Sequence, residues 1–140
     1  MAIAPDPMLA LIAYLLADTD VASLAGARVY GAELPEGASQ PVLPPTVLIQ
    51  DAGGLGDRGY SDQYNWRVDV FAYGPDPEQA KQLQMACIGA LRKLERRVVN
   101  GTMLYSASKE AGPNPGRSQT SLWPFSFSVW SVETSYLEVV

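Results

Sequence analysis

Residues 64–97 constrain the fold more than any other stretch, because they read as a strand, a capped turn and a helix in one unbroken run. Alternating apolar and polar residues over 64–73 predict a half-buried strand, and apolar residues at helical spacing predict a helix from Pro77 to about Arg97. Asp76 is placed to cap this helix, and Pro77 takes its first position, where a missing N–H costs nothing. The run indicates an α+β domain and contains no catalytic motif. The apolar residues are Tyr64, Trp66, Val68, Val70 and Ala72 of the strand and Ala80, Leu83, Cys87, Leu91 and Leu94 of the helix.

A second helix is predicted at 7–17, with Pro7 at its first position. Its core-facing stripe is expected to consist of Leu9, Ile12, Ala13 and Leu16, widened by Leu11 and Leu15. The remaining predicted elements are a helical turn at 21–24 and strands at 28–30, 46–50, 102–108 and 125–133. Three segments rich in glycine, proline or polar residues, 31–45, 51–62 and 109–121, are predicted as long loops.

This order of elements predicts a single α+β domain over 1–140. Two amphipathic helices must bury their stripes, and one face of a sheet offers both a site. We therefore expect a two-layer sandwich, with a mostly antiparallel sheet of four to five strands and two helices packed on one face. The other sheet face would carry Arg67, Asp69, Phe71 and Tyr73 from the strand at 64–73. Such a mixed face suits a protein–protein interface, although one of the loops could equally cover it.

Charge and residue usage exclude several functional classes. The chain has a net charge of −5, which disfavours a protein that grips nucleic acid by neutralising phosphates. Its densest basic group, Arg92-Lys93 with Arg96-Arg97, ends the helix predicted at 77–97, where cations complement the helix dipole. There is no histidine, so the commonest general base and metal ligand is missing, and the one cysteine, Cys87, lies on a predicted buried stripe. We expect no enzymatic activity.

The sequence also gives no support for a bound metal or cofactor. Asp51, Asp57 and Asp62 share one loop, but their spacing lacks the alternate-residue pattern and terminal glutamate of a calcium loop. The glycine-rich residues 53–56 precede a predicted strand rather than a helix N-terminus, so they do not form a phosphate-binding loop. We therefore expect neither a metal nor another cofactor.

Four passages in the same order carry a resemblance to a known family. They are the Val21–Leu24 turn leading into Arg28-Val29-Tyr30, the Leu43-Pro44-Pro45 step into the strand at 46–49, the strand at 66–73 followed by the helix containing Ala80, and Trp123 with the strand at 125–129. This layout resembles the tail terminator, or tail-completion, proteins of long-tailed phages with non-contractile tails and of related gene transfer agents. The segment 109–121 has no clear counterpart in that pattern.

The resemblance implies a structural virion protein of the tail and neck, assembled in the host cytoplasm. Six copies would form a ring that caps the completed tail tube, stops its polymerisation and offers the surface that joins head and tail. The implied partners are the chain itself, the tail tube protein on one side and a head connector or adaptor on the other. DNA would pass through the lumen without sequence-specific binding, and no membrane would be involved.

The residues expected to make ring or tube contacts lie mainly in or beside the loops. They are Asp57, Arg58, Tyr60, Asp62, Arg67, Tyr73 and Arg117. A heterologous ring needs two different patches on each subunit, and the segments 51–62 and 109–121 are the expected contact arms. The alternatives are another neck component, such as a head-completion or adaptor protein, and a small-molecule-binding α+β domain.

Overall fold

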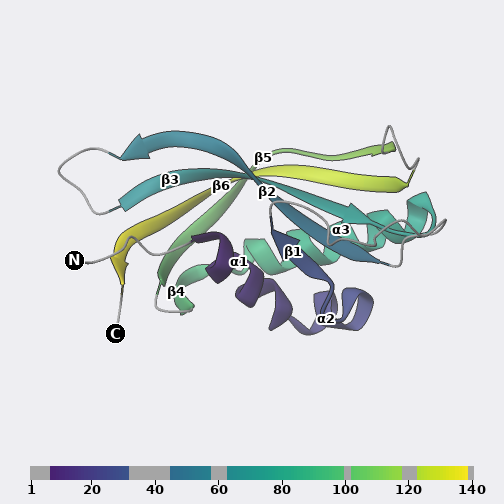
Figure 1. Cartoon of the computed structure of the whole chain (residues 1–140), viewed down its shortest axis with the longest axis horizontal. Helices are drawn as coiled ribbons and strands as arrows, with labels where there is room; N and C mark the ends of the chain where they lie inside the picture. The colour runs from purple at the N-terminus through teal and green to yellow at the C-terminus, as the bar shows by residue number, and fades with distance from the viewer. Residues whose placement is uncertain (1–6, 32–44, 58–62, 100–101, 118–122, 139–140) are drawn as a thin grey trace.

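The computed structural model describes residues 7–31, 45–57, 63–99, 102–117 and 123–138. These residues form three helices and six strands (Figure 1). In chain order the elements are α1 (Pro7–Leu16), α2 (Thr19–Ala25), β1 (Val29–Gly31), β2 (Thr46–Asp57), β3 (Gln63–Tyr73), α3 (Pro77–Arg92), β4 (Glu95–Val99), β5 (Thr102–Arg117) and β6 (Pro124–Glu138). Within this described part, no single helix is long and apolar enough to cross a membrane. By length and composition α1 and α2 would qualify only as a pair bent by 84°.

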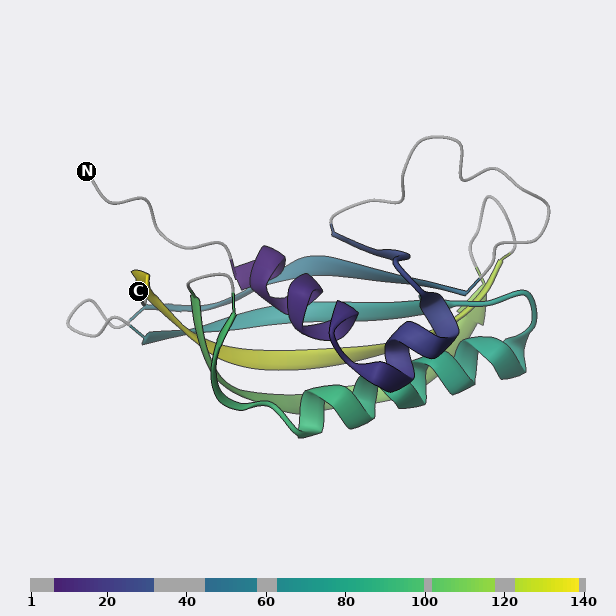
Figure 2. The same ribbon diagram turned by 90° about the horizontal axis from the view of Figure 1, so that it is seen from below.

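All six strands belong to one sheet in the order β1-β2-β3-β6-β5-β4. β1 runs parallel to β2 and the other neighbours are antiparallel, so the sheet is mixed. It curls into a half-barrel, and all three helices lie on one side of it (Figure 2). The chain is α+β as predicted. The predicted two-layer sandwich with four to five strands and two helices is wrong, because a sixth strand and a third helix are present and register shifts bend the sheet.

The helix α3 begins as predicted and ends earlier. The Asp76 carboxylate accepts a 2.8 Å hydrogen bond from the Gln79 backbone N–H, and the Gln79 side-chain amide donates a 3.2 Å bond to the other oxygen of this carboxylate. The helix stops at Arg92, so the prediction that it reaches Arg97 is wrong. The next residues form the edge strand β4, four of whose five side chains are exposed, which gives the segment no alternation by which a strand could be recognised.

Two of the predicted loops are largely strand. Residues 51–57 extend β2 and residues 109–117 extend β5, so both segments pair with a neighbour along most of their length. Register shifts interrupt the alternation of side chains in both extensions. Glycine and proline are also uncommon within strands, so the sequence of these segments did not indicate a strand. The β2–β3 and β5–β6 pairs project from opposite ends of the molecule (Figure 1). Of the first predicted loop, Gly31 ends β1, and 32–44 lie outside the described residues.

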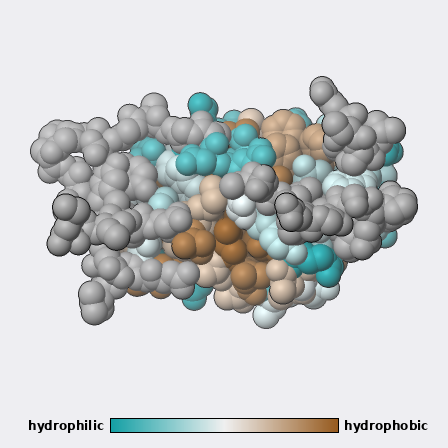
Figure 3. Space-filling model, in the orientation of Figure 1, coloured by the Kyte–Doolittle hydropathy of each residue, from teal (hydrophilic) through white to brown (hydrophobic). Residues whose placement is uncertain are grey.

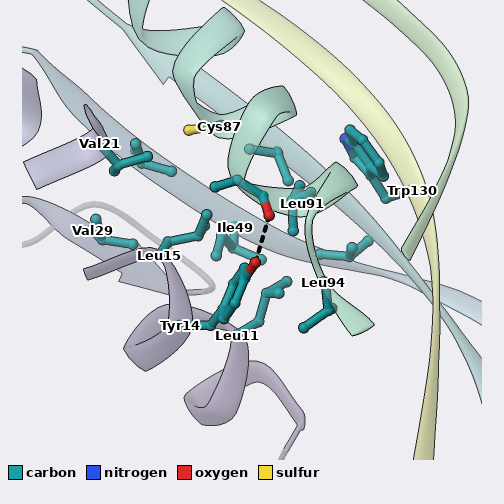
Figure 4. Close-up of a cluster of buried hydrophobic side chains, with 14 of the residues drawn as sticks. Leu11, Tyr14, Leu15, Val21, Val29, Ile49, Cys87, Leu91, Leu94 and Trp130 are labelled. Carbon is teal, nitrogen blue, oxygen red and sulfur yellow. Dashed lines mark hydrogen bonds between the residues drawn. The ribbon is translucent and has the colours of Figure 1, made fainter. Parts of the chain in front are cut away.

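The main core lies between the helices and the sheet face that they cover. Leu11 and Leu15 of α1, Leu91 of α3 and Ile49 of β2 meet there and are inaccessible to solvent (Figure 4). The Tyr14 hydroxyl donates a 2.6 Å hydrogen bond to the carbonyl oxygen of Ala90, and this bond ties α1 to α3. Ala90 lies in the last turn of α3, where carbonyl groups lack helical partners. This oxygen also accepts a 3.2 Å hydrogen bond from the Lys93 backbone N–H, so Tyr14 supplies its second donor.

A buried polar network crosses the same core. The side-chain amide of Gln84, which is inaccessible to solvent, donates to the carbonyl oxygens of Val70 at 3.0 Å and Ser126 at 2.6 Å. Its oxygen accepts a 2.9 Å bond from the Ser128 hydroxyl, and that hydroxyl accepts a 2.7 Å bond from the Trp130 indole N–H. Because its members satisfy one another, the hydrogen bonds of the network offset the cost of burying these polar groups and fix α3 against β3 and β6.

Candidate interaction surface

The sheet face opposite the helices, which we call the open face, carries a row of side chains that runs across five strands. Backbone register places Tyr30 beside Leu48, Leu48 beside Phe71, Phe71 beside Phe127 and Phe127 beside Asn114. Residues paired in this way point to the same face of a sheet. The open face therefore contains an apolar row that continues from β1 to the far side of β6.

Five rings on this face form an aromatic cluster, defined here as Phe71, Tyr73, Trp123, Phe125 and Phe127. The ring of Phe71 stacks on that of Phe127 with centroids 5.5 Å apart and meets the edge of Phe125 at 5.4 Å. Tyr73 meets Phe125 at 5.7 Å and Trp123 at 6.4 Å, both edge to face. Phe71, Phe125 and Phe127 are half-buried and still reach solvent, whereas Tyr73 and Trp123 are buried. Such ring pairs stabilise the sheet beyond their buried area.

The sequence builds this cluster through strand alternation and one glycine. In β6, Phe125 and Phe127 point to the open face, while the intervening serines point toward α3. Gly116 of β5 is the register partner of Phe125. A Cβ atom at Gly116 would lie 2.7 Å from two carbon atoms of the Phe125 ring, so only glycine lets the ring lie over β5.

Toward the other end of β3 the open face becomes polar. The Arg67 guanidinium contacts one carboxylate oxygen of Glu110 through two nitrogens, at 2.6 and 3.0 Å. Glu110 sits at the register shift between Lys109 and Ala111, and this bulge places it beside Arg67. Next to the pair, burial raises the pKa of the Asp69 carboxyl above 3.8, and the positive charge of Arg67 partly opposes the rise. The open face thus divides into an apolar half and a charged half.

The predicted contact residues do not form one site. Arg67 and Tyr73 lie on the open face, in its charged and its aromatic half respectively. Asp57 ends β2, opposite Tyr64, whereas Arg117 ends β5, opposite Pro124. Their register partners on the middle strands are about ten residues apart along β6, or about 34 Å. Arg58, Tyr60 and Asp62 lie outside the described residues. Whether any of these residues makes contacts stays a prediction.

A second apolar surface lies on the helix side and was missed in the sequence, where its residues were assigned to the core. The side chains of Leu9 and Leu16 are 57% and 36% exposed, and with the half-buried Ala13 they form the stripe that we call the α1 stripe. The predicted inward stripe is therefore wrong for Leu9 and Leu16, whereas Leu11 and Leu15, which were predicted to widen it, are buried. The buried residues are Ala10, Leu11, Tyr14 and Leu15. Viewed as in Figure 1, the space-filling surface shows a hydrophobic patch over α1 (Figure 3).

Two contacts fix α1 in this orientation. The Tyr14 hydrogen bond holds one side of the helix toward α3. On another side, Met8 and Ile12 pack over Gly31, where an added Cβ would lie 2.6 Å from the Met8 sulfur and 3.0 Å from Ile12 Cδ1. Because α1 is apolar around its whole circumference, these contacts, rather than a polar face, decide which leucines stay outside.

The described residues offer little that resembles a catalytic or metal site. Burial raises the pKa of the Cys87 thiol to about 12, so this group is a packing residue. Within the described ranges, no three histidine, cysteine, aspartate or glutamate side chains are placed to hold a metal ion. Of the predicted dipole-complementing cations, Arg92 ends α3, whereas Arg96 and Arg97 lie in β4. There the Arg97 guanidinium lies 5.6 Å from the centre of the Tyr14 ring.

Comparisons with known proteins identify a matching family and a solved structure with the same fold. The family described as tail completion protein gp17 matches residues 9–108. One solved structure with the same fold is a chain in the virion of a native gene transfer agent particle. The two chains share 18% identity with a TM-score of 0.63, and the match covers 91% of this chain and 93% of the other. No match was found among curated protein sequences.

Proposed function

The chain belongs to the tail completion protein gp17 family, and from that premise we propose that six copies form a ring that caps the finished tail tube. The ring stops tube polymerisation and presents the surface to which the head connector or adaptor binds. The observation that carries the proposal is the family match, which spans 9–108. It covers α1 from Leu9, the elements from α2 to β4 and the first part of β5, and it does not include β6.

The charge of the chain supports a role around passing DNA. At a net charge of −5, a ring of these subunits repels phosphates, so DNA slides through the lumen without being held. No sequence-specific contact with DNA and no catalytic step is part of this role. We place the ring in the neck region of the virion, after assembly in the host cytoplasm.

The two projecting strand pairs support contacts with other components. The β2–β3 pair and the β5–β6 pair extend from opposite ends of the sheet, so one can contact the tube while the other contacts the connector or a neighbouring subunit (Figure 1). Asp57 ends β2 in the first pair and Arg117 ends β5 in the second, while Arg67 and Tyr73 lie on the face between them. Arg58, Tyr60 and Asp62 belong to the predicted contact segment 51–62 and lie outside the described residues.

The deciding experiment deletes the gene for this chain and examines the particles by electron microscopy. Without the cap we expect tails of irregular and excessive length that do not join heads. Supplying the wild-type chain should restore uniform, joined tails. Tails of normal length that still fail to join heads would instead indicate a head-completion or adaptor role and would refute termination.

A further inference from the structure

The α1 stripe and the aromatic half of the open face are two unlike apolar surfaces on opposite sides of one chain. The α1 stripe combines Leu9, Ala13 and Leu16 on the outer side of a helix that contains no charged residue. The aromatic half presents Phe71, Phe125 and Phe127, again without a charged side chain among the clustered rings. A helix ridge and a sheet face are the pair of shapes that pack together within α+β proteins.

We propose that the α1 stripe of one copy packs on the aromatic half of the open face of the next copy. This inference rests on the proposed ring and names its subunit contact. Each sheet would then lie between its own helices on one side and α1 of a neighbour on the other.

The presence of two unlike apolar surfaces on one chain favours a second copy as the occupant of both, because a heterologous ring needs two different patches on each subunit. Identical chains that each carry −5 repel one another, so their contacts are most favourable where neither surface carries charge. The two surfaces meet that condition. The acidic and basic side chains that border them, such as Asp18 beyond α1 and Arg67 and Asp69 on the open face, are left at the rim, where charges are tolerated.

The placement of the surfaces also decides the symmetry of the contact. A patch that binds its own copy gives an isologous dimer, which stops at two chains. Here a helix stripe and a sheet face are joined, so the contact is heterologous and every copy still has one surface free. Such a contact continues from copy to copy until a rotation closes it into a ring.

Cysteine cross-linking tests the contact directly. Leu16→Cys places a thiol on the α1 stripe, and Asn114→Cys places one on the exposed β5 position beside Phe127. The native Cys87 is inaccessible to solvent and should not react with a short bifunctional maleimide. We expect the equimolar mixture to give cross-linked dimers and the double variant to give a ladder up to the ring. Each single variant alone should give no cross-link.

A matched control uses another exposed apolar residue that belongs to neither surface. Val98→Cys on β4 is 44% exposed, and mixed with Asn114→Cys it should not cross-link. Cross-linking of Leu16→Cys with itself would show an isologous α1 contact and overturn the proposal. A wild-type ring without cross-links in the mixture would overturn it too, while leaving the proposed function intact. A wild-type chain that stays monomeric at every concentration tested would overturn both the contact and the free-standing ring.

Complementation of two defective variants gives an independent measurement. Leu9→Glu with Leu16→Glu should disable the α1 stripe, and Phe127→Glu should disable the aromatic half, so native mass spectrometry should find each alone as a monomer. Mixed together, they should form a one-to-one dimer through the surface that each retains, and no larger species. Met85→Glu, at a residue that is 51% exposed on α3, should leave the ring unchanged. Loss of the ring in the Met85 variant, or no dimer from two variants with folded circular dichroism spectra, would contradict the proposal.

Discussion

The two faces of the same sheet differ in how completely their side chains are buried. The covered face holds aliphatic residues and two large aromatic ones, Trp66 and Trp130, all buried beneath the helices, together with a closed hydrogen-bond network. The open face holds rings that shield one another only in part. Burial on the first face supplies folding energy, whereas the second keeps apolar area that folding leaves partly wet. The covered face therefore stabilises the fold, and the open face keeps apolar area that is available for the proposed subunit contact.

The strongest test of this comparison truncates the covered face. Trp130→Ala removes a fully buried side chain and the N–H donor to Ser128, and we expect a loss of about 3–5 kcal/mol in the free energy of unfolding. Since domains are stable by only about 5–15 kcal/mol, the variant should be close to unfolding. Denaturation in urea monitored by circular dichroism measures the loss. A loss below about 1 kcal/mol would show that this side of the sheet is not the stabilising core.

A second test breaks the polar network without changing its volume much. Gln84→Met leaves the Ser128 hydroxyl and two carbonyl oxygens without their side-chain partner, so we expect a loss of about 2–3 kcal/mol. Gln82→Met on the exposed side of the same helix is the control, with an expected change below about 0.5 kcal/mol. Equal effects from both variants would mean that the network contributes nothing specific.

The open face should respond in the opposite way to truncation. Phe127→Ala loses a half-buried ring and its stacking on Phe71, for which we expect only about 1–2 kcal/mol of destabilisation. Its effect on assembly should be much larger, because the Phe127 side chain is part of the proposed subunit contact. Native mass spectrometry and urea denaturation of the same sample separate the two effects. If the Phe127→Ala protein still assembles into the six-subunit ring, the open face has no role in assembly.

The smallest expected effect concerns the charged half of the open face. Burial raises the pKa of Asp69 in the folded chain, so the folded state holds a proton over a pH range in which the unfolded state has lost it. The free energy of unfolding should therefore fall as pH rises from 3.8 through the raised pKa and then level off. Asp69→Asn should lack this pH dependence, so its free energy of unfolding should rise relative to that of the wild type across this pH range. A constant difference between the two proteins at every pH would contradict the assignment.

Sequence patterns predicted the elements whose environment is local. The Asp76 cap, the start of α3 and its buried stripe followed from hydrogen bonds and spacings within a few residues, and the structure has all three. The strands at 64–73 and 125–133 were predicted because their alternation is regular. β4 and the outer part of β5 were not, because exposed residues, prolines and register shifts remove that regularity. The described contact residues lie at both ends of the sheet and on its open face. The sequence did not show this, because strand register depends on which residues of separate segments pair.

By itself the sequence determined that an apolar helix begins at Pro7, that a capped amphipathic helix begins at Pro77, and that the chain is α+β. Only the tertiary structure decided which side of α1 is buried. A helix that is apolar all round has no preferred face of its own. The choice was made by a hydroxyl that reaches a carbonyl 76 residues away and by a glycine in β1 that admits two side chains. The leucines left outside by those two contacts are the ones available to a neighbouring copy.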